Sequence, residues 1–307
     1  MAVSLKQAPR NKNIRNIKNF QINPFSAATL GGGLAVQVLK WLFLVTVALV
    51  MIFPVAYAIV GSFKSNQELT TGGTLLPAQW NFDNYVQAWN IANFGQALGN
   101  SLFICVWAVL GGLFTATMAA YCLARREFPG RKLLLGLYTA LLFISIGPLN
   151  LRPLYELAVT FGVNNSLWPV IFILIGGQTV NIFILQAYIK TIPRELDEAA
   201  TMDGAGFFRI YWQIVMPLCK PALGVVALFE FRQAWNEYLF PLVFTLNNPS
   251  LRPLSVAVTS LRYNDTAATQ WNLMLTGAAI SIVPLLLVYV FTSRAFISGL
   301  TSGAVKG

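Results

Sequence analysis

The chain has 307 residues, of which 56% are hydrophobic and 10% charged, with a mean hydropathy of +0.62 and a formal net charge of +10. This composition excludes an ordinary soluble domain. There is no histidine, which excludes a histidine base or a histidine-based zinc site, and there is no G-x-x-x-x-G-K-[ST] pattern to cradle nucleotide phosphates. The three cysteines fall in or beside apolar stretches and are expected to pack as small apolar side chains, not to bind metal: Cys105, Cys122 and Cys219.

Six apolar stretches are long enough to cross a hydrocarbon core of about 30 Å. The predicted fold class is therefore all-α, a polytopic membrane protein with six transmembrane helices. The predicted spans are 41–62, 97–124, 133–152, 167–189, 220–245 and 271–293.

The first 40 residues are basic and contain no acidic residue. The first apolar run begins only around Trp41, which is too late for the core of a cleaved signal peptide. Residues 1–40 are therefore predicted to be a cytoplasmic tail attracted to anionic lipid. A nucleic-acid role is not favoured. With this end inside, sixteen Lys and Arg residues fall in cytoplasmic segments, four in outer segments and one, Arg232, inside a span. The positive-inside rule then places both termini in the cytoplasm.

Glycine and proline interrupt the middle spans. Gly111-Gly112 in the second span favours close helix packing. Gly147-Pro148, Pro169 and Gly176-Gly177 mark breaks that membrane helices tolerate next to other helices or a pathway. The amides of Gln178 and Asn181 are either pathway groups or hydrogen-bond partners between helices.

The most distinctive stretch is the acidic loop 191–217, predicted to be cytoplasmic. Four of the chain's eleven carboxylates lie between Glu195 and Asp203, where they suit the positive N-terminal end of a helix. Gly204 predicts the end of that helix, and the apolar residues after it recur at helical spacing up to Pro217. The loop is predicted to be two short helices joined by a bend.

The spacing in this loop is that of a known motif. Glu198-Ala199-Ala200, three residues, Gly204, nine residues and Ile214-x-Met216-Pro217 resemble the EAA loop of ABC-importer permeases. Met216 replaces the family's Leu, a nearly volume-conserving change. The resemblance implies a coupling helix that docks into a groove on a separate ATPase. The residues expected to carry this coupling are Glu198, Ala199, Ala200, Asp203, Gly204, Ile214 and Pro217. An amphipathic helix lying on the inner membrane surface is the alternative, but such a helix is expected to be rich in Lys and Arg, and this loop is acidic.

Other short matches resemble the carbohydrate branch of the same permeases. They are F-K-S at 63–65, N-Y at 84–85, N-S-L at 100–102, W-N-E-Y at 235–238, Pro284 and the tail that ends in A-V-K-G at 304–307. This tail is a possible second ATPase contact or a free terminus. The aromatic residues of the outer segment 62–96 are expected mostly at the membrane interface.

The fifth predicted span carries charges inside the hydrocarbon region. Intramembrane charges are costly and are functional candidates by default. Glu230 and Glu237 are seven residues apart and share a helix face, whereas Arg232 points elsewhere. A packing or gating role is the alternative to substrate contact. The substrate-pathway candidates are Glu230, Arg232, Asn236 and Glu237.

The chain is thus interpreted as a permease subunit of a binding-protein-dependent importer in a prokaryotic inner membrane, with a permease domain over 41–307. The resemblance implies an oligosaccharide or related polyol as substrate. It also implies an ATPase dimer that holds ATP and Mg, a second permease subunit in a heterodimer and an external solute-binding protein. The chain itself is expected to be no enzyme and to bind no cofactor. An ion-coupled secondary carrier that uses its intramembrane charges is the main alternative, and a membrane-embedded transferase is the other.

Overall fold

The computed structural model describes residues 34–72, 74–144, 147–262 and 269–304. Most of the predicted basic tail and the last three residues, 305–307, lie outside the described residues. Within the described ranges the chain is helical and has no β-strand. The predicted all-α class is therefore confirmed.

The chain divides into two units, Met1–Ala56 and Tyr57–Gly307. Helix α1 (Leu34–Gly61) begins in the first unit and ends in the second. Its segment Val36–Gly61 has a mean hydropathy of 2.6 and is long enough to cross a bilayer.

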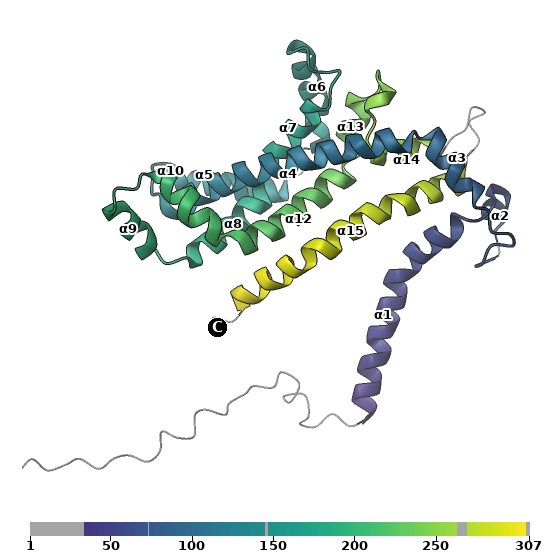
Figure 1. The fold of residues 1–307 in the computed structure, drawn as a ribbon, viewed down its shortest axis with the longest axis horizontal. Helices are drawn as coiled ribbons and strands as arrows, with labels where there is room; N and C mark the ends of the chain where they lie inside the picture. Colours follow the sequence, from purple (N-terminus) through teal and green to yellow (C-terminus); the bar gives the residue numbers. More distant parts are fainter. Residues whose placement is uncertain (1–33, 73, 145–146, 263–268, 305–307) are drawn as a thin grey trace, which may run out of the picture. The chain divides into compact units, whose positions relative to one another are not determined.

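The second unit holds the remaining helices (Figure 1). Its short outer helices are α2 (Asn66–Thr71) and α3 (Asp83–Ile91), followed by the long α4 (Phe94–Arg125). The next helices are α5 (Arg131–Phe143), α6 (Leu151–Thr160), α7 (Trp168–Gly176), α8 (Thr179–Thr191), α9 (Glu195–Met202) and α10 (Phe207–Ile210). The last are α11 (Met216–Leu218), α12 (Lys220–Asn236), α13 (Leu239–Phe244), α14 (Leu254–Ser260) and α15 (Trp271–Ala304).

Helix α4 is the centre of this unit, because it packs against α7, α8 and α12, and α12 in turn packs against α15. One core cluster, which includes Ile104, Val170 and Ile171, joins α4 and α7. A second includes Ala120, Leu185 and Val215 and joins α4, α8 and the segment after α10. Gly112 confirms the expected close approach, since a Cβ there would lie 2.7 Å from Gln178 Nε2.

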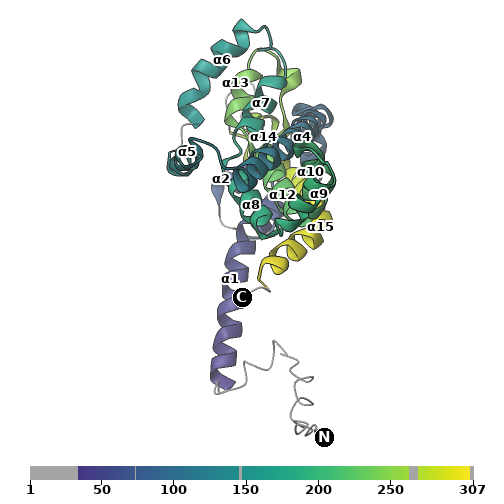
Figure 2. The same ribbon diagram turned by 90° about the vertical axis from the view of Figure 1, so that its left-hand side faces the viewer.

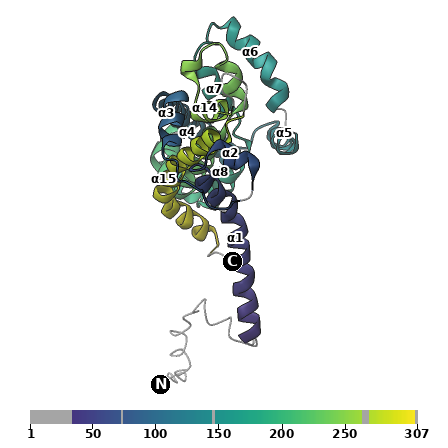
Figure 3. The ribbon, with the colours of Figure 1, turned by 90° about the vertical axis from the view of Figure 1, so that its right-hand side faces the viewer.

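The acidic loop and the outer segment lie at opposite ends of the second unit (Figure 1). Figure 2 faces the end that carries α9 and α10, and Figure 3 faces the end that carries α2 and α3. This separation agrees with the predicted assignment of the two segments to opposite sides of a membrane.

Only some of the predicted spans are single continuous helices in the structure. Among the described residues, three helices are long and apolar enough to cross a membrane, or up to five if two bent pairs each count as one span. The bent pairs are α7 with α8, at 46°, and Phe207–Leu218 with α12, at 81°. The stretch 133–152 is not one continuous helix, because α5 ends at Phe143 and a 3₁₀ turn, Gly147–Asn150, precedes α6.

The predicted fifth span, 220–245, is also interrupted. Helix α12 ends at Asn236 and α13 starts at Leu239. Glu237 explains the break, because its Oε1 accepts hydrogen bonds from the backbone N–H groups of Leu239 (3.1 Å) and Phe240 (3.3 Å). A side chain that caps the first turn of a new helix stabilises an interruption of the old one.

Candidate functional site

The first half of the acidic loop is the short helix α9. Three acids lie in its first turn, Glu195, Asp197 and Glu198, where they complement the helix dipole. Gly204 ends the helix as predicted, with a φ of 79° in the left-handed region. The N–H of Ala205 bonds to Ala200 O (2.9 Å) and that of Gly204 to Thr201 O (3.0 Å), which forms a Schellman cap. Gly204 therefore fixes the angle between α9 and α10.

An ion pair anchors α9 to the end of α4. Arg125 Nε lies 2.9 Å from Asp197 Oδ2, and the two side chains are 6% and 17% exposed. Arg125 Nη2 also donates to Ile192 O at 2.8 Å, so one guanidinium contacts the loop on both sides of Pro193. Burial raises the pKa of the Asp197 carboxyl above its ordinary value, and the nearby Arg125 charge opposes that shift. The loop is thus attached to α4, the helix at the centre of the second unit.

Aromatic packing adds to this attachment. Phe207 of α10 lies 4.8 Å from the Tyr121 ring, centroid to centroid, and Arg126 is 5.1 Å above the Phe207 ring. Tyr121 also contacts Tyr211, at 5.6 Å. Both short helices of the loop therefore contact the C-terminal end of α4.

The predicted coupling residues divide into two groups. Glu198, Ala199 and Asp203 are exposed, whereas Ala200 is half-buried and packs against the second core cluster. The exposed side also carries large apolar groups, since Leu196 is 42% and Met202 88% exposed. Leu196 and Met202 are six residues apart on a helix of 3.6 residues per turn, so they are two separate apolar groups beside the carboxylates, and both are accessible to a partner protein.

Ile214 and Pro217 lie in the irregular second half of the loop. Ile214 is half-buried against the second core cluster. Residues Tyr211–Val215 form a π-helical turn in which Met216 N–H bonds to Tyr211 O, just before Pro217, which has no N–H to donate. The larger bend, 81°, follows at Cys219 and turns the chain into α12.

Glu230 is buried between helices. It is 2% exposed, and Asn181 Nδ2 of α8 donates a hydrogen bond to its Oε1. Asn181 also donates to Gln178 Oε1 at 2.9 Å. A Cβ on Gly112 would lie 2.9 Å from Glu230 Oε2, so α4 also packs closely against this carboxylate. Asn181 is therefore a hydrogen-bond partner between α8 and α12, one of the two roles that the sequence left open, and Gln178 Nε2 donates to Leu174 O of α7 at 3.0 Å.

The other three candidates of the fifth span lie apart from Glu230. Arg232 is exposed and, among the described residues, forms no ion pair. Asn236 Nδ2 donates to Arg232 O, one turn earlier in α12, at 2.8 Å. Glu237 caps α13 as described above. The W-N-E-Y sequence thus builds a helix break, and the structure does not bring the three charged side chains together.

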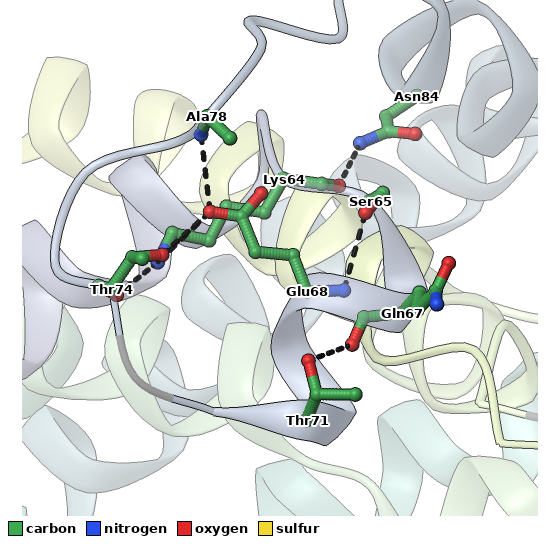
Figure 4. Close-up of polar contacts among 8 residues, drawn as sticks. All are labelled: Lys64, Ser65, Gln67, Glu68, Thr71, Thr74, Ala78 and Asn84. Atoms are coloured by element: carbon green, nitrogen blue, oxygen red, sulfur yellow. Dashed lines mark hydrogen bonds and ion pairs between the residues drawn. The ribbon is translucent and has the colours of Figure 1, made fainter.

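The outer segment is a folded cap held by buried polar groups. Lys64 is 2% exposed; its ammonium donates to Thr74 O and lies 3.8 Å from Glu68 Oε1 (Figure 4). Glu68 Oε1 also accepts from Thr74 Oγ1 (2.6 Å) and from Ala78 N (3.1 Å). These donors hold the pKa of the Glu68 carboxyl below its usual value.

The short motifs of the outer segment have structural roles. Asn84 donates to Ser62 O and Lys64 O, both at 2.8 Å, and accepts from Asn272 of α15 at 3.0 Å. Phe63 packs on Trp80, Phe82 and Tyr85 with centroid distances of 5.1–5.2 Å. Part of the aromatic set expected at the membrane interface therefore forms a cluster around Phe63, in which Trp80 and Phe82 remain exposed.

The N-S-L sequence has a similar role. Asn100 Nδ2 donates to the carbonyl oxygens of Ser250 (2.8 Å) and Arg252 (3.1 Å), and Leu254 N donates to Ser101 Oγ (2.7 Å). These bonds attach the start of α4 to the segment before α14.

Sequence reasoning missed Arg125, which counted only as one more cytoplasmic charge. Its place directly after the predicted span 97–124, on the same predicted side as the acidic loop, is the signal that would have suggested a pair with Asp197. The break at Glu237 was also missed, although a carboxylate two residues before a helix start is a capping signal.

Three long apolar helices, breaks within three predicted spans and an anchored acidic loop are typical of a membrane-embedded transporter subunit. The chain belongs to a family described as the binding-protein-dependent transport system inner membrane component, whose model matches residues 36–300. Members of this family are ABC-transporter permeases that carry no ATPase of their own, so the chain is not an enzyme.

Two relatives illustrate the relationship. The chain is 32% identical over 263 residues to the probable starch degradation products transport system permease protein AmyC of Thermoanaerobacterium thermosulfurigenes, covering 85% of this chain and 94% of AmyC. It is 31% identical over 272 residues to the arabinooligosaccharides transport system permease protein AraQ of Bacillus subtilis, covering 87% and 95%.

Solved structures agree on the fold. A chain of a bacterial ABC transporter involved in the import of the acidic polysaccharide alginate matches with a TM-score of 0.71 and 23% identity, over 85% of this chain and 96% of that one. A chain of an alginate transporter in complex with a periplasmic protein bound to an alginate pentasaccharide matches with a TM-score of 0.60 and 18% identity, over 84% and 93%.

Proposed function

We propose that this chain forms part of the translocation pathway of an ABC importer for an oligosaccharide or related polyol, and that α9 couples it to a separate ATPase. The observation that carries the coupling role is that α9, whose Glu198, Ala199 and Asp203 are exposed, is held to α4 by the ion pair of Arg125 and Asp197. The names of the relatives, which concern starch products and arabinooligosaccharides, support the substrate class.

The proposal includes the membrane topology. Residues 41–307 form the permease domain with six spans, the region 133–152 crosses the membrane as an interrupted span, and both termini are cytoplasmic. The basic charge of residues 1–40 and the position of α9 and α10 opposite α2 and α3 support this orientation.

The partners follow from the coupling mechanism. An ATPase dimer that binds ATP and Mg offers two docking grooves, whereas this chain has one EAA-like loop. A second permease chain is therefore required, and we propose a heterodimer that receives substrate from an external solute-binding protein. ATP binding closes the ATPase dimer, the attached loop moves α4, and the pathway opens outward. ATP hydrolysis then returns the transporter to its starting conformation.

The residue roles in this proposal are specific. Glu198, Ala199 and Asp203 contact the ATPase, Ala200 and Ile214 hold the loop against its own helices, and Gly204 and Pro217 shape its bends. In the fifth span, Asn236 and Glu237 shape the pathway at the helix break, Glu230 holds α8 and α12 together, and Arg232 faces the pathway.

A pull-down in mild detergent tests the coupling role. The native chain is expected to bring down a P-loop ATPase and a second permease, and Glu198→Lys is expected to lose the ATPase alone. Glu127→Lys is the matched control, because Glu127 is an exposed acid on the same predicted side but outside α9. Retention of the ATPase by Glu198→Lys would refute the docking role. Uptake that survives ATP depletion and follows a proton gradient would favour a secondary carrier instead.

A further inference from the structure

A cavity of about 660 Å³ lies between α6, α7 and the break that separates α12 from α13. Its lining includes Asn150, Phe161, Phe172, Gly177, Gln233 and Glu237. This volume falls within the range of about 300–1,000 Å³ that is typical of ligand pockets. We call it the break cavity.

Two interrupted helices meet at this cavity. Helix α7 ends at Gly176 and the chain bends by 46° before α8, while α12 ends at Asn236 and α13 begins two residues later. Helix α13 packs against α7, so the two breaks are neighbours. Helix ends present backbone groups without intrahelical partners, and transporters use such ends inside the membrane to bind substrate.

The lining combines exposed aromatic rings with amides. Phe161 is 71% and Phe172 63% exposed. Gln233 is exposed, and its Nε2 lies 3.9 Å from where a Cβ on Gly177 would be, so the amide runs along the break between α7 and α8. Asn150 supplies a second amide.

This chemistry matches a sugar ring. One face of a pyranose presents C–H groups, which pack on the electron-rich face of an aromatic ring, and its edges present hydroxyl groups, which bond to amides and carbonyls. An acyl chain of a lipid would leave the amides and the carboxylate without partners at a cost.

The charge of the side chains that line the cavity further restricts the class of sugar that it can bind. Among the described residues that line the cavity, Glu237 is the one charged side chain, and there is no lysine or arginine. A carboxylate repels an acidic sugar and leaves it without a cation partner, whereas the hydroxyl groups of a neutral sugar can donate to it. The fold neighbour, by contrast, belongs to a transporter for an acidic polysaccharide.

We propose that the break cavity binds one ring of a neutral glycan during transport, with Gln233 and Asn150 on its hydroxyl groups, and that it disfavours uronic acids. The inference rests on the proposed importer function and adds a substrate site within this subunit.

Uptake kinetics test the site in the complete transporter, reconstituted in liposomes with its ATPase, second permease and binding protein. The probes are maltotriose, raffinose, arabinotriose and the acidic trigalacturonate. Gln233→Leu is expected to raise the KM for the transported neutral sugar about threefold to tenfold, the effect of one lost hydrogen bond, with kcat unchanged. Gln37→Leu makes the same chemical change at an exposed position of α1 and should leave KM unchanged.

A labelling experiment provides a readout that does not depend on activity. The thiol of Gln233→Cys is reacted with a maleimide and quantified by mass, beside Val180→Cys, which is exposed on α8 outside the cavity. The transported neutral sugar is expected to slow labelling at position 233 several-fold and to leave position 180 unaffected.

Three results would overturn the site. In the first, the Gln233→Leu complex transports with an unchanged KM, and the neutral sugar does not slow labelling at position 233. In the second, trigalacturonate slows this labelling as much as the neutral sugar does. The third is protection that follows the lipid composition instead of the sugar, which would assign the cavity to an acyl chain. ATP-dependent uptake persists in all three, so the proposed function stands. If none of the four sugars is transported, the carbohydrate assignment and this site fail together.

Discussion

Replacing Arg125 by leucine should release α9 from α4. The substitution keeps an apolar stem but removes the charge that faces Asp197 at 2.9 Å and the hydrogen bond to Ile192 O. Breaking a fully buried ion pair costs about 3–5 kcal/mol, and an exposed pair is worth less than about 1 kcal/mol. Because Asp197 keeps 17% exposure, we expect a loss of about 2–3 kcal/mol in the local stability of the loop.

Amide hydrogen exchange of Glu195–Met202 measures this loss directly. A decrease of that size should speed exchange in α9 roughly 30- to 150-fold, with little change in α12. In the complete transporter the same variant should hydrolyse ATP without matching sugar uptake, because the loop no longer moves α4. Arg126→Leu is the matched control. It removes a cation from the Phe207 ring, an interaction worth about 0.5–1 kcal/mol at an exposed site, and should change exchange only a few-fold.

Two further results distinguish an ion pair from general packing damage. The double variant Arg125→Leu with Asp197→Leu should recover most of the protection, because an apolar pair no longer buries an uncompensated charge. Burial already raises the pKa of Asp197, and loss of Arg125 raises it further. The exchange defect of Arg125→Leu, corrected for intrinsic rates, should therefore shrink as pH falls towards this raised pKa and Asp197 is neutralised. Unchanged exchange in Arg125→Leu, or equal effects from Arg126→Leu, would refute the anchor.

Three other predictions concern single elements. Gly204→Ala should cost about 1–2 kcal/mol locally because its φ of 79° disfavours a Cβ, and faster proteolysis between α9 and α10 would reveal it. Asn181→Leu should lower the thermal midpoint in detergent, because it leaves the buried Glu230 Oε1 without its donor, at a cost of about 1–3 kcal/mol. Glu230→Gln keeps an acceptor for Asn181 and should change the midpoint little. Equal losses in the two variants would contradict this prediction. The lowered pKa of Glu68 stabilises the outer cap above about pH 4.5, and this contribution is lost as pH falls through the folded-state pKa. Protection of α2 should therefore fall on acidification, and Glu68→Gln should abolish that pH dependence.

Local sequence signals predicted the helices and their ends well. The apolar stretch 97–124 became α4, and the stretch 271–293 lies within α15. Gly204 ends α9 because a residue without a Cβ can take a positive φ, a property of one residue and its neighbours. The EAA-like motif and the other short matches resembled one family, and the match over residues 36–300 confirmed that resemblance.

Hydropathy was a poorer guide to continuity. In 133–152 the interruption lies at Gly147-Pro148, where the sequence predicted a break, but the apolar residues of 220–245 predicted an unbroken span that ends at Asn236 and resumes at Leu239. Averaging over a window of about 19 residues hides a break that one capping side chain stabilises, as Glu237 does for α13.

The sequence by itself determined the membrane class, the helix signals and the acidic motif, because composition, periodicity and turn chemistry act between residues close in the chain. The tertiary structure decided what those residues contact. Asn181 and Glu230 are 49 positions apart, and Arg125 is 67 positions from Ile192, so only the packing of α4, α8 and α12 brings them together. A buried carboxylate or guanidinium needs a partner, and the fold alone selects which one it receives.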